Sequence, residues 1–231
     1  MLNDYDDFLQ KLRSVGFSMG GGNAKGIFSL LAETGEGREP EDSPIRWHCE
    51  QPDIDPWEWR MRVLEEETDI AYSKLFFKTS GYITKPWYSY FLAARRGGKS
   101  FSELYETGSI SYMSKRIYEV ILAHGQVPLH ELKLFCGIKK EDSAKFDRAL
   151  TELQMKMFIT MSGRARKLNK YGLEYGWNST VFCTVEEFWK IRNVSLDTYS
   201  FEEAYEAIKI QVLTLNPDAE PKTIHRFILG A

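Results

Sequence analysis

The apolar residues between positions 110 and 190 change their spacing once, and this change constrains the fold more than any other feature. Three segments have the spacing of amphipathic helices, namely SYMSKRIYEVILAHG (111–125), QVPLHELKLFCGI (126–138) and KKEDSAKFDRALTELQMKMFI (139–159). In the third segment one helix face is apolar at every turn, at Phe146, Leu150, Leu153 and Met157. We therefore expect three helices around a shared core.

After the third helix, the apolar spacing becomes that of strands. FITMS (158–162) and STVFCTV (179–185) are rich in β-branched and aromatic residues, which favours two strands. The segment between them, GRARKLNKYGLEYGWN (163–178), contains three glycines and predicts a connecting loop. Three helices followed by a hairpin with a basic connection are typical of a winged helix-turn-helix, whose third helix can enter the major groove of DNA.

Basic residues are concentrated in this middle segment, although the whole chain is slightly acidic. The chain has 30 Lys+Arg and 33 Asp+Glu, whereas residues 111–173 contain 12 basic and 6 acidic residues. No acidic residue lies between Glu152 and Glu174. Such a partition favours contact with the phosphates of double-stranded DNA. The predicted contact residues lie on the third helix and in the basic connection: Lys145, Arg148, Arg164, Arg166, Lys167 and Lys170.

The flanking segments predict helices. Residues 1–109 are expected to form a helical, aromatic-rich subdomain, in which Asp55 and Pro56 begin one helix. The aromatic stretch 69–108 is expected to be helical in two or three pieces, and its rings either fill a core or stack on bases. Residues 191–231 are expected to be a C-terminal helical segment for packing or homodimerisation. The expected fold class is mainly α with a small β-hairpin, an α+β arrangement with the winged helix at 110–190.

Several classes of site and location are not favoured by the sequence. Cys49, Cys136 and Cys183 are scattered and odd in number, so we expect reduced thiols in a cytoplasmic protein. The adjacent His48 and Cys49 have no CxxC or HxxxH companion, so no metal is expected. The glycines at 20–26 lack the lysine of a phosphate-binding loop, and no cofactor is expected. No apolar run approaches the about 18 residues that span a membrane.

Long stretches of the chain resemble the bacterial AlkZ-related winged-helix proteins. The resemblance runs through WHCEQPDIDPWEWRMRVLEE (47–66), DIAYSKLFFKTSGYITKPWYSYFLAARR (69–96) and the 110–190 segment. Within these, DPWEWR and SGYIT are the more specific stretches. Better-studied relatives of that family are DNA glycosylases built from tandem winged-helix units, which remove alkylated bases or unhook crosslinks. The resemblance therefore implies recognition of DNA lesions.

The resemblance also implies catalytic candidates. Those glycosylases use a Gln-hydrophobic-Gln or Gln-hydrophobic-Asp motif to place a water against the sugar. Gln51-Pro52-Asp53 matches this motif in outline, with proline in place of the aliphatic residue. Hydrolysis needs an amide to orient water and a carboxylate to activate it, so Gln51 and Asp53 are the candidates. The leading hypothesis is a DNA-binding protein without its own chemistry. The alternatives are a glycosylase-like enzyme and a protein-interaction or structural module.

Overall fold

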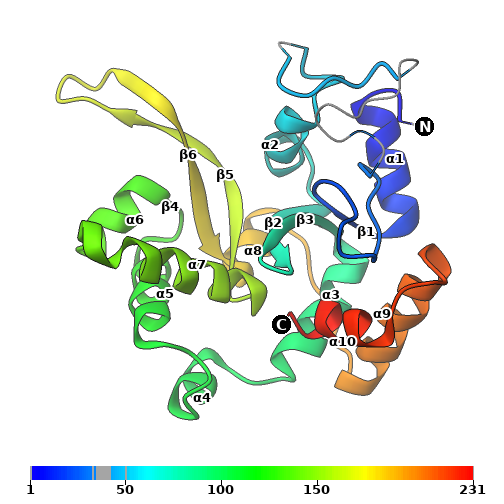
Figure 1. The fold of residues 1–231 in the computed structure, drawn as a ribbon. Coiled ribbons are helices and arrows are strands. Elements are labelled where there is room, and N and C mark those ends of the chain that lie inside the picture. Colours follow the sequence, from blue (N-terminus) through cyan, green and yellow to red (C-terminus); the bar gives the residue numbers. More distant parts are fainter. Residues whose placement is uncertain (1, 33, 35–42, 50, 231) are drawn as a thin grey trace. The chain divides into compact units, whose positions relative to one another are not determined.

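The computed structural model describes residues 2–32, 34, 43–49 and 51–230, and it divides into two compact units. Unit 1 combines the chain up to Gly97 with the chain from Leu196 onward, and unit 2 spans Gly98–Ser195. Each unit contains helices and one small antiparallel sheet, so the protein is α+β (Figure 1). The segment from residue 191, expected as a separate C-terminal piece, lies partly in each unit.

The expectation that the aromatic stretch 69–108 is helical was wrong for residues 70–84, which form two strands. Unit 1 contains a three-stranded antiparallel sheet of β1 (Phe17–Met19), β2 (Ile70–Phe76) and β3 (Thr79–Thr84), with β3 in the centre. All but one residue of β2 are buried, so its apolar side chains show neither the helical nor the alternating spacing. Phe77 and Lys78 form the turn with positive φ angles of 50° and 64°. A short, fully buried strand cannot be distinguished from a helix by apolar spacing alone.

In the described residues of unit 1, the sheet is accompanied by five helices: α1 (Tyr5–Val15), α2 (Pro56–Glu66), α3 (Lys85–Arg96), α9 (Phe201–Leu215) and α10 (Pro221–Leu229). Asp55 caps α2 as predicted, because its Oδ1 accepts hydrogen bonds from the backbone N–H groups of Trp57 and His48, at 2.8 and 3.1 Å. Helices α9 and α10 pack against α3 and against each other. The last helices are therefore part of the unit 1 core.

The aromatic residues at 76–91 fill the core of unit 1. Phe76, Tyr82, Tyr88 and Phe91 are fully buried. Phe227 of α10 lies against Phe76 with ring centroids 4.4 Å apart, and against Phe91 at 5.4 Å. The guanidinium of Arg95 donates hydrogen bonds to the carbonyl oxygens of Ile228 and Phe227, at 3.0 and 2.9 Å. Arg95 thus holds the C-terminal end of α10.

An ion pair in unit 1 makes its stability depend on pH. Arg13 binds Asp69 through two hydrogen bonds of 3.0 and 2.9 Å, and this lowers the pKa of the Asp69 carboxyl. Because the pKa of Asp69 is lower in the folded protein than in the unfolded chain, where it is about 4, the ion pair stabilises the fold above that pH. This stabilisation is lost as the pH falls below about 4 and through the folded-state pKa. We expect Arg13→Gln to destabilise the protein at pH 6 and to have a much smaller effect at pH 3. Urea unfolding at both values measures this, and an equal loss at both would contradict it.

Unit 2 consists of helices followed by a long hairpin. Its helical elements are α4 (Phe101–Glu106), α5 (Tyr112–His124), α6 (Leu129–Phe135), the 3-10 turn η1 (Lys140–Asp142), α7 (Ser143–Met155) and α8 (Val185–Ile191). Its sheet consists of β4 (Val127–Pro128), β5 (Ile159–Leu168) and β6 (Glu174–Thr184), in the order β4-β6-β5. Helices α5, α6 and α7 begin and end close to the predicted positions.

The predicted apolar stripes of these helices lie in the core of unit 2. Met113, Ile117 and Ile121 of α5 are buried, as are Phe146, Leu150 and Leu153 of α7. Met157 was predicted on the same helical stripe, but α7 ends at Met155 and Met157 has a φ of 60°. It is nevertheless fully buried, in the turn that leads into β5.

Candidate nucleic-acid interface

The basic connection of unit 2 is mostly strand, and not a loop as predicted. β5 continues to Leu168 and β6 begins at Glu174, so only residues 169–173 form the turn. The cross-strand partners Lys167 with Tyr175 and Leu168 with Glu174 extend the ladder to this turn. Pairing with a neighbouring strand supplies the backbone hydrogen bonds that local sequence does not reveal. The distal half of the hairpin extends beyond the helices of unit 2 (Figure 1).

The turn at the tip is held by one side chain. Asn169 Oδ1 accepts hydrogen bonds from the backbone N–H groups of Tyr171 and Leu173, at 2.9 and 3.1 Å. The backbone N–H of Asn169 donates to the carbonyl of Leu173 at 2.9 Å, and that of Gly172 donates to the carbonyl of Asn169 at 3.0 Å. Asn169 thus acts as an Asx turn inside the hairpin turn. The tip is a defined structure that presents its side chains in fixed directions.

A bulge in β6 lies opposite Arg166. Ala165 pairs with Ser179 and Lys167 pairs with Tyr175, so Arg166 alone faces Gly176, Trp177 and Asn178. Gly176 has a φ of 72°, which glycine adopts without strain. Trp177 projects from this bulge and is 94% exposed. Bulges bend a strand and redirect its side chains, and this bulge places a large aromatic ring in solvent.

The four predicted basic residues of the hairpin differ in their surroundings. Arg164 is half-buried, and Arg166 lies 3.7 Å from Glu174 in a pair whose two side chains are more than half exposed. Such an exposed pair contributes little to stability and leaves the guanidinium accessible. Lys167 makes no ion pair within the described part of the chain. The Lys170 Nζ lies 4.9 Å from the centre of the Tyr171 ring.

On α7 the acidic side chains Asp147 and Glu152 contact other residues of unit 2, whereas the basic side chains Lys145 and Arg148 make no ion pair among the described residues. Lys145 and Arg148 are also exposed. Asp147 lies 3.5 Å from Lys133 of α6. Glu152 accepts a 2.6 Å hydrogen bond from Ser114 near the start of α5, where a helix N-terminus favours negative charge. Two acidic side chains of α7 are thus engaged inside unit 2.

Three polar residues of α7 are candidates for contacts to bases, namely Ser143, Thr151 and Gln154, and Gln154 is buried. Its Nε2 donates to the carbonyl of Leu150 at 3.0 Å, and the side chain is 1% exposed. Thr151 donates its hydroxyl to the carbonyl of Asp147, one turn earlier on the same helix. Of the three polar residues, only Ser143 at the start of α7 has no such contact to its own helix. The exposed chemistry of α7 is therefore mainly cationic, which suits phosphates and carries little sequence information.

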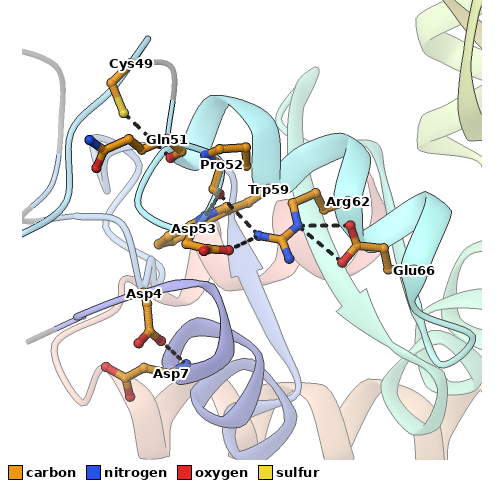
Figure 2. Close-up of polar contacts among 9 residues, drawn as sticks. All are labelled: Asp4, Asp7, Cys49, Gln51, Pro52, Asp53, Trp59, Arg62 and Glu66. Carbon is orange, nitrogen blue, oxygen red and sulfur yellow. Dashed lines mark hydrogen bonds and ion pairs between the residues drawn. The ribbon is translucent and has the colours of Figure 1, made fainter.

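The two catalytic candidates lie in unit 1, in the turn before α2 (Figure 2). Gln51 is exposed, and its carbonyl accepts a hydrogen bond from the N–H of Ile54 at 3.1 Å. The Asp53 side chain is 81% exposed, and its Oδ1 accepts a 2.8 Å hydrogen bond from Nη1 of Arg62. Trp59 Nε1 and Arg62 Nη1 donate to the carbonyl of Pro52, at 3.0 and 3.3 Å, and fix the turn on α2.

Arg62 connects this turn to the rest of unit 1. Its guanidinium lies over the ring of Tyr5 at 3.9 Å, and its Nε donates to Glu66 at 3.0 Å. Although partial burial favours the neutral form, the hydrogen bonds to Glu66 and Asp53 raise the pKa of Arg62. The solvent-exposed Asp53 carboxylate, paired with the permanently charged Arg62, thus has a structural role in holding the turn against α2.

Thiol and metal chemistry have little support in the described residues. The three cysteines are free, and burial raises the pKa of the Cys183 thiol to about 12 and also that of Cys136. A protonated buried thiol is inert as a nucleophile. No group of three or more His, Cys, Asp or Glu residues in the described ranges is arranged to hold a metal ion. Likewise, no described helix is both long enough and apolar enough to cross a membrane.

The feature that sequence reasoning missed is the exposed apolar tip of the hairpin. Five large side chains there are at least half exposed: Leu168, Tyr171, Leu173, Tyr175 and Trp177. Aromatic residues between two strand patterns are usually core residues, so composition gave no reason to expect them in solvent. The one feature of the sequence that indicated their exposure is that glycines and lysines surround them, as is typical of a segment on the protein surface.

Comparison with known proteins agrees with the expected family. The sequence model of the family described as AlkZ related matches residues 2–229. A solved structure, the Streptomyces sahachiroi DNA glycosylase AlkZ, is similar with a TM-score of 0.41 and 10% identity, over 77% of this chain and 51% of that chain. The present chain thus spans about half the length of that structure. No curated protein matches. Because the family match covers nearly every residue, the chain belongs to the AlkZ related family.

Proposed function

We propose that unit 2 is a winged helix-turn-helix module that binds double-stranded DNA through α7 and the β5–β6 hairpin. The order of α5, α6, α7 and the hairpin, with β4 beside β6, corresponds to the helices and wing of such modules. In this assignment α7 is the recognition helix and β5–β6 is the wing. In this proposal the protein binds DNA in the cytoplasm.

The observation that carries this proposal is the set of uncompensated cations in unit 2. Lys145, Arg148 and Lys167 make no ion pair among the described residues, while the acidic Asp147 and Glu152 are engaged by Lys133 and Ser114. Cations without partners are positioned to neutralise phosphates and release the counterions of DNA. Arg166 and Lys170, which are exposed on the hairpin, and the half-buried Arg164 are proposed as further phosphate contacts.

Fluorescence anisotropy of a labelled duplex across a salt series tests the proposal. We expect the affinity to fall steeply as salt rises from about 50 to 200 mM. The triple variant Lys145→Ala/Arg148→Ala/Lys167→Ala should bind more weakly, with a salt slope reduced by about 0.9 for each phosphate that is no longer neutralised. A control variant, Lys25→Ala/Lys190→Ala/Lys222→Ala, removes an equal number of positive charges at exposed positions away from α7 and the hairpin. Equal weakening in the two variants would show that only net charge matters, and would contradict an interface at α7 and the hairpin.

A second candidate function, removal of an altered base, has one observation in its favour. The chain belongs to the AlkZ related family, and the Gln51-Pro52-Asp53 turn keeps the outline of a water-positioning motif. Its Asp53 carboxylate is bound to Arg62 and open to solvent. If this candidate function is right, the wild-type protein releases the altered base from lesion-bearing duplexes. Gln51→Ala and Asp53→Asn should each abolish that release.

A protein-binding role is a third candidate, supported by exposed apolar residues elsewhere in unit 2. Leu122 of α5 and Leu134 and Phe135 of α6 are 61%, 74% and 46% exposed. Exposed apolar side chains that gather on one surface often mark a partner site. Homodimerisation through the C-terminal segment is a proposal that analytical ultracentrifugation tests directly.

A further inference from the structure

The tip of the hairpin combines exposed aromatic rings with cations in a way that phosphate contact alone does not require. Trp177 and Tyr171 are 94% and 75% exposed, and Tyr175 is 51% exposed. An exposed indole on a hairpin contributes nothing to the core of its own unit. Large aromatic side chains in solvent are typical of surfaces that become buried when a partner binds.

The tip is preorganised, which favours a specific contact. Asn169 fixes the turn that carries Tyr171, and the bulge at Gly176–Asn178 directs Trp177 outward. A side chain held in place before binding loses less conformational entropy on contact. The hydrogen-bonded turn and the bulge therefore define the backbone that carries the two rings before DNA binds.

The charge around the rings identifies the chemistry of the partner. Glu174 is the single acidic residue of the sequence between Glu152 and Glu186, and it lies 3.7 Å from Arg166. Lys170 lies over Tyr171, and Lys167 is the cross-strand partner of Tyr175. Cations beside flat apolar rings fit a partner that has negative backbone charge and flat apolar groups. Nucleic acid has both, because its bases stack on aromatic side chains while its phosphates bind the cations.

We propose that the exposed rings of Trp177 and Tyr171 stack on unpaired bases, so that the protein prefers DNA whose base stack is interrupted. In an intact duplex each base is already stacked on both faces, and an aromatic ring gains contact only after unstacking a step at a cost of a few kcal/mol. A gap or an unpaired base removes that cost. This inference rests on the proposed DNA binding of unit 2 and names the class of DNA that the hairpin selects.

The test compares binding to an intact duplex with binding to the same duplex containing a short single-stranded gap. Each stacked base contributes about 1–3 kcal/mol, so wild type should bind the gapped DNA about 5–150-fold more tightly. Trp177→Ala should abolish most of this preference while leaving the affinity for intact duplex and its salt slope unchanged. Trp177→Phe, which keeps a flat ring, should retain most of the preference. Trp57→Ala, which removes a 43% exposed tryptophan from α2, is the matched control and should change neither affinity.

The other outcomes separate the two proposals. Salt-dependent binding of wild type with equal affinity for both DNAs would overturn the stacking inference and leave the proposed function standing. Equal weakening on both DNAs in Trp177→Ala would overturn it as well, because the ring would then be a general contact. No salt-dependent binding of wild type to either DNA would overturn the proposed function, and this inference with it.

Discussion

Replacing Gly16 with alanine is expected to lower the free energy of unfolding by about 2–5 kcal/mol. Gly16 ends α1 with a φ of 92°, in the region where a side chain costs about 1–2 kcal/mol. A Cβ at this position would also overlap the indole ring of Trp87 at Cδ1, and overpacking of this kind costs about 1–3 kcal/mol. Urea unfolding measures the sum of these two effects.

The backbone at Gly16 cannot move away to relieve the clash, because three hydrogen bonds fix it. Its N–H donates to the carbonyl of Leu12 at 2.7 Å, and its carbonyl accepts from the backbone N–H and the hydroxyl of Thr84, at 2.9 and 3.0 Å. Gly26→Ala is the matched control, since Gly26 has a φ of 64° but no atom within 4 Å of the place that an alanine methyl group would occupy. A similar destabilisation in both variants would show that backbone strain alone matters and that contact with Trp87 does not.

Replacing Phe227 with alanine is expected to cost about 3–5 kcal/mol, the usual effect of removing a buried phenyl ring. Phe227 is 1% exposed and lies in α10, yet its ring contacts Phe17, Phe76 and Phe91 from the first part of the chain. The cavity would lie between three rings that are held by the sheet and by α3, so the site cannot collapse easily. Unfolding followed by the fluorescence of the tryptophans measures the change.

Phe201→Ala provides the comparison for Phe227→Ala. Phe201 begins α9, is 41% exposed and contacts the ring of Tyr205 at 5.9 Å, so its removal should cost less than about 1 kcal/mol. Two equal, small effects would mean that α10 is a detachable segment and not a part of the unit 1 core. The Arg95 contacts with the end of α10 argue for the integrated arrangement.

The helices of unit 2 were predictable because they are locally determined. Met113, Ile117 and Ile121 of α5, and Phe146 and Leu150 of α7, repeat at helical spacing, and each helix buries the face that carries them. The cap at Asp55 was predictable for the same reason, since a cap and its helix lie within a few residues of each other. Gln51 and Asp53 were found through family resemblance, and the structure adds that Arg62 binds the second of them.

The sequence by itself determined the α5–α7 helices, the strand character of residues 159–162 and 179–184, and the basic character of residues 161–170. Periodicity and charge are properties of short segments. Only the tertiary structure decided that residues 70–84 join β1 in one buried sheet, since the pairing of β1 with β3 joins positions more than 60 residues apart. It alone also decided that Phe227 is core and Trp177 is solvent-exposed. Whether a residue is buried depends on which other element packs against its face of the strand. An aromatic residue in a strand pattern can therefore be either buried or exposed.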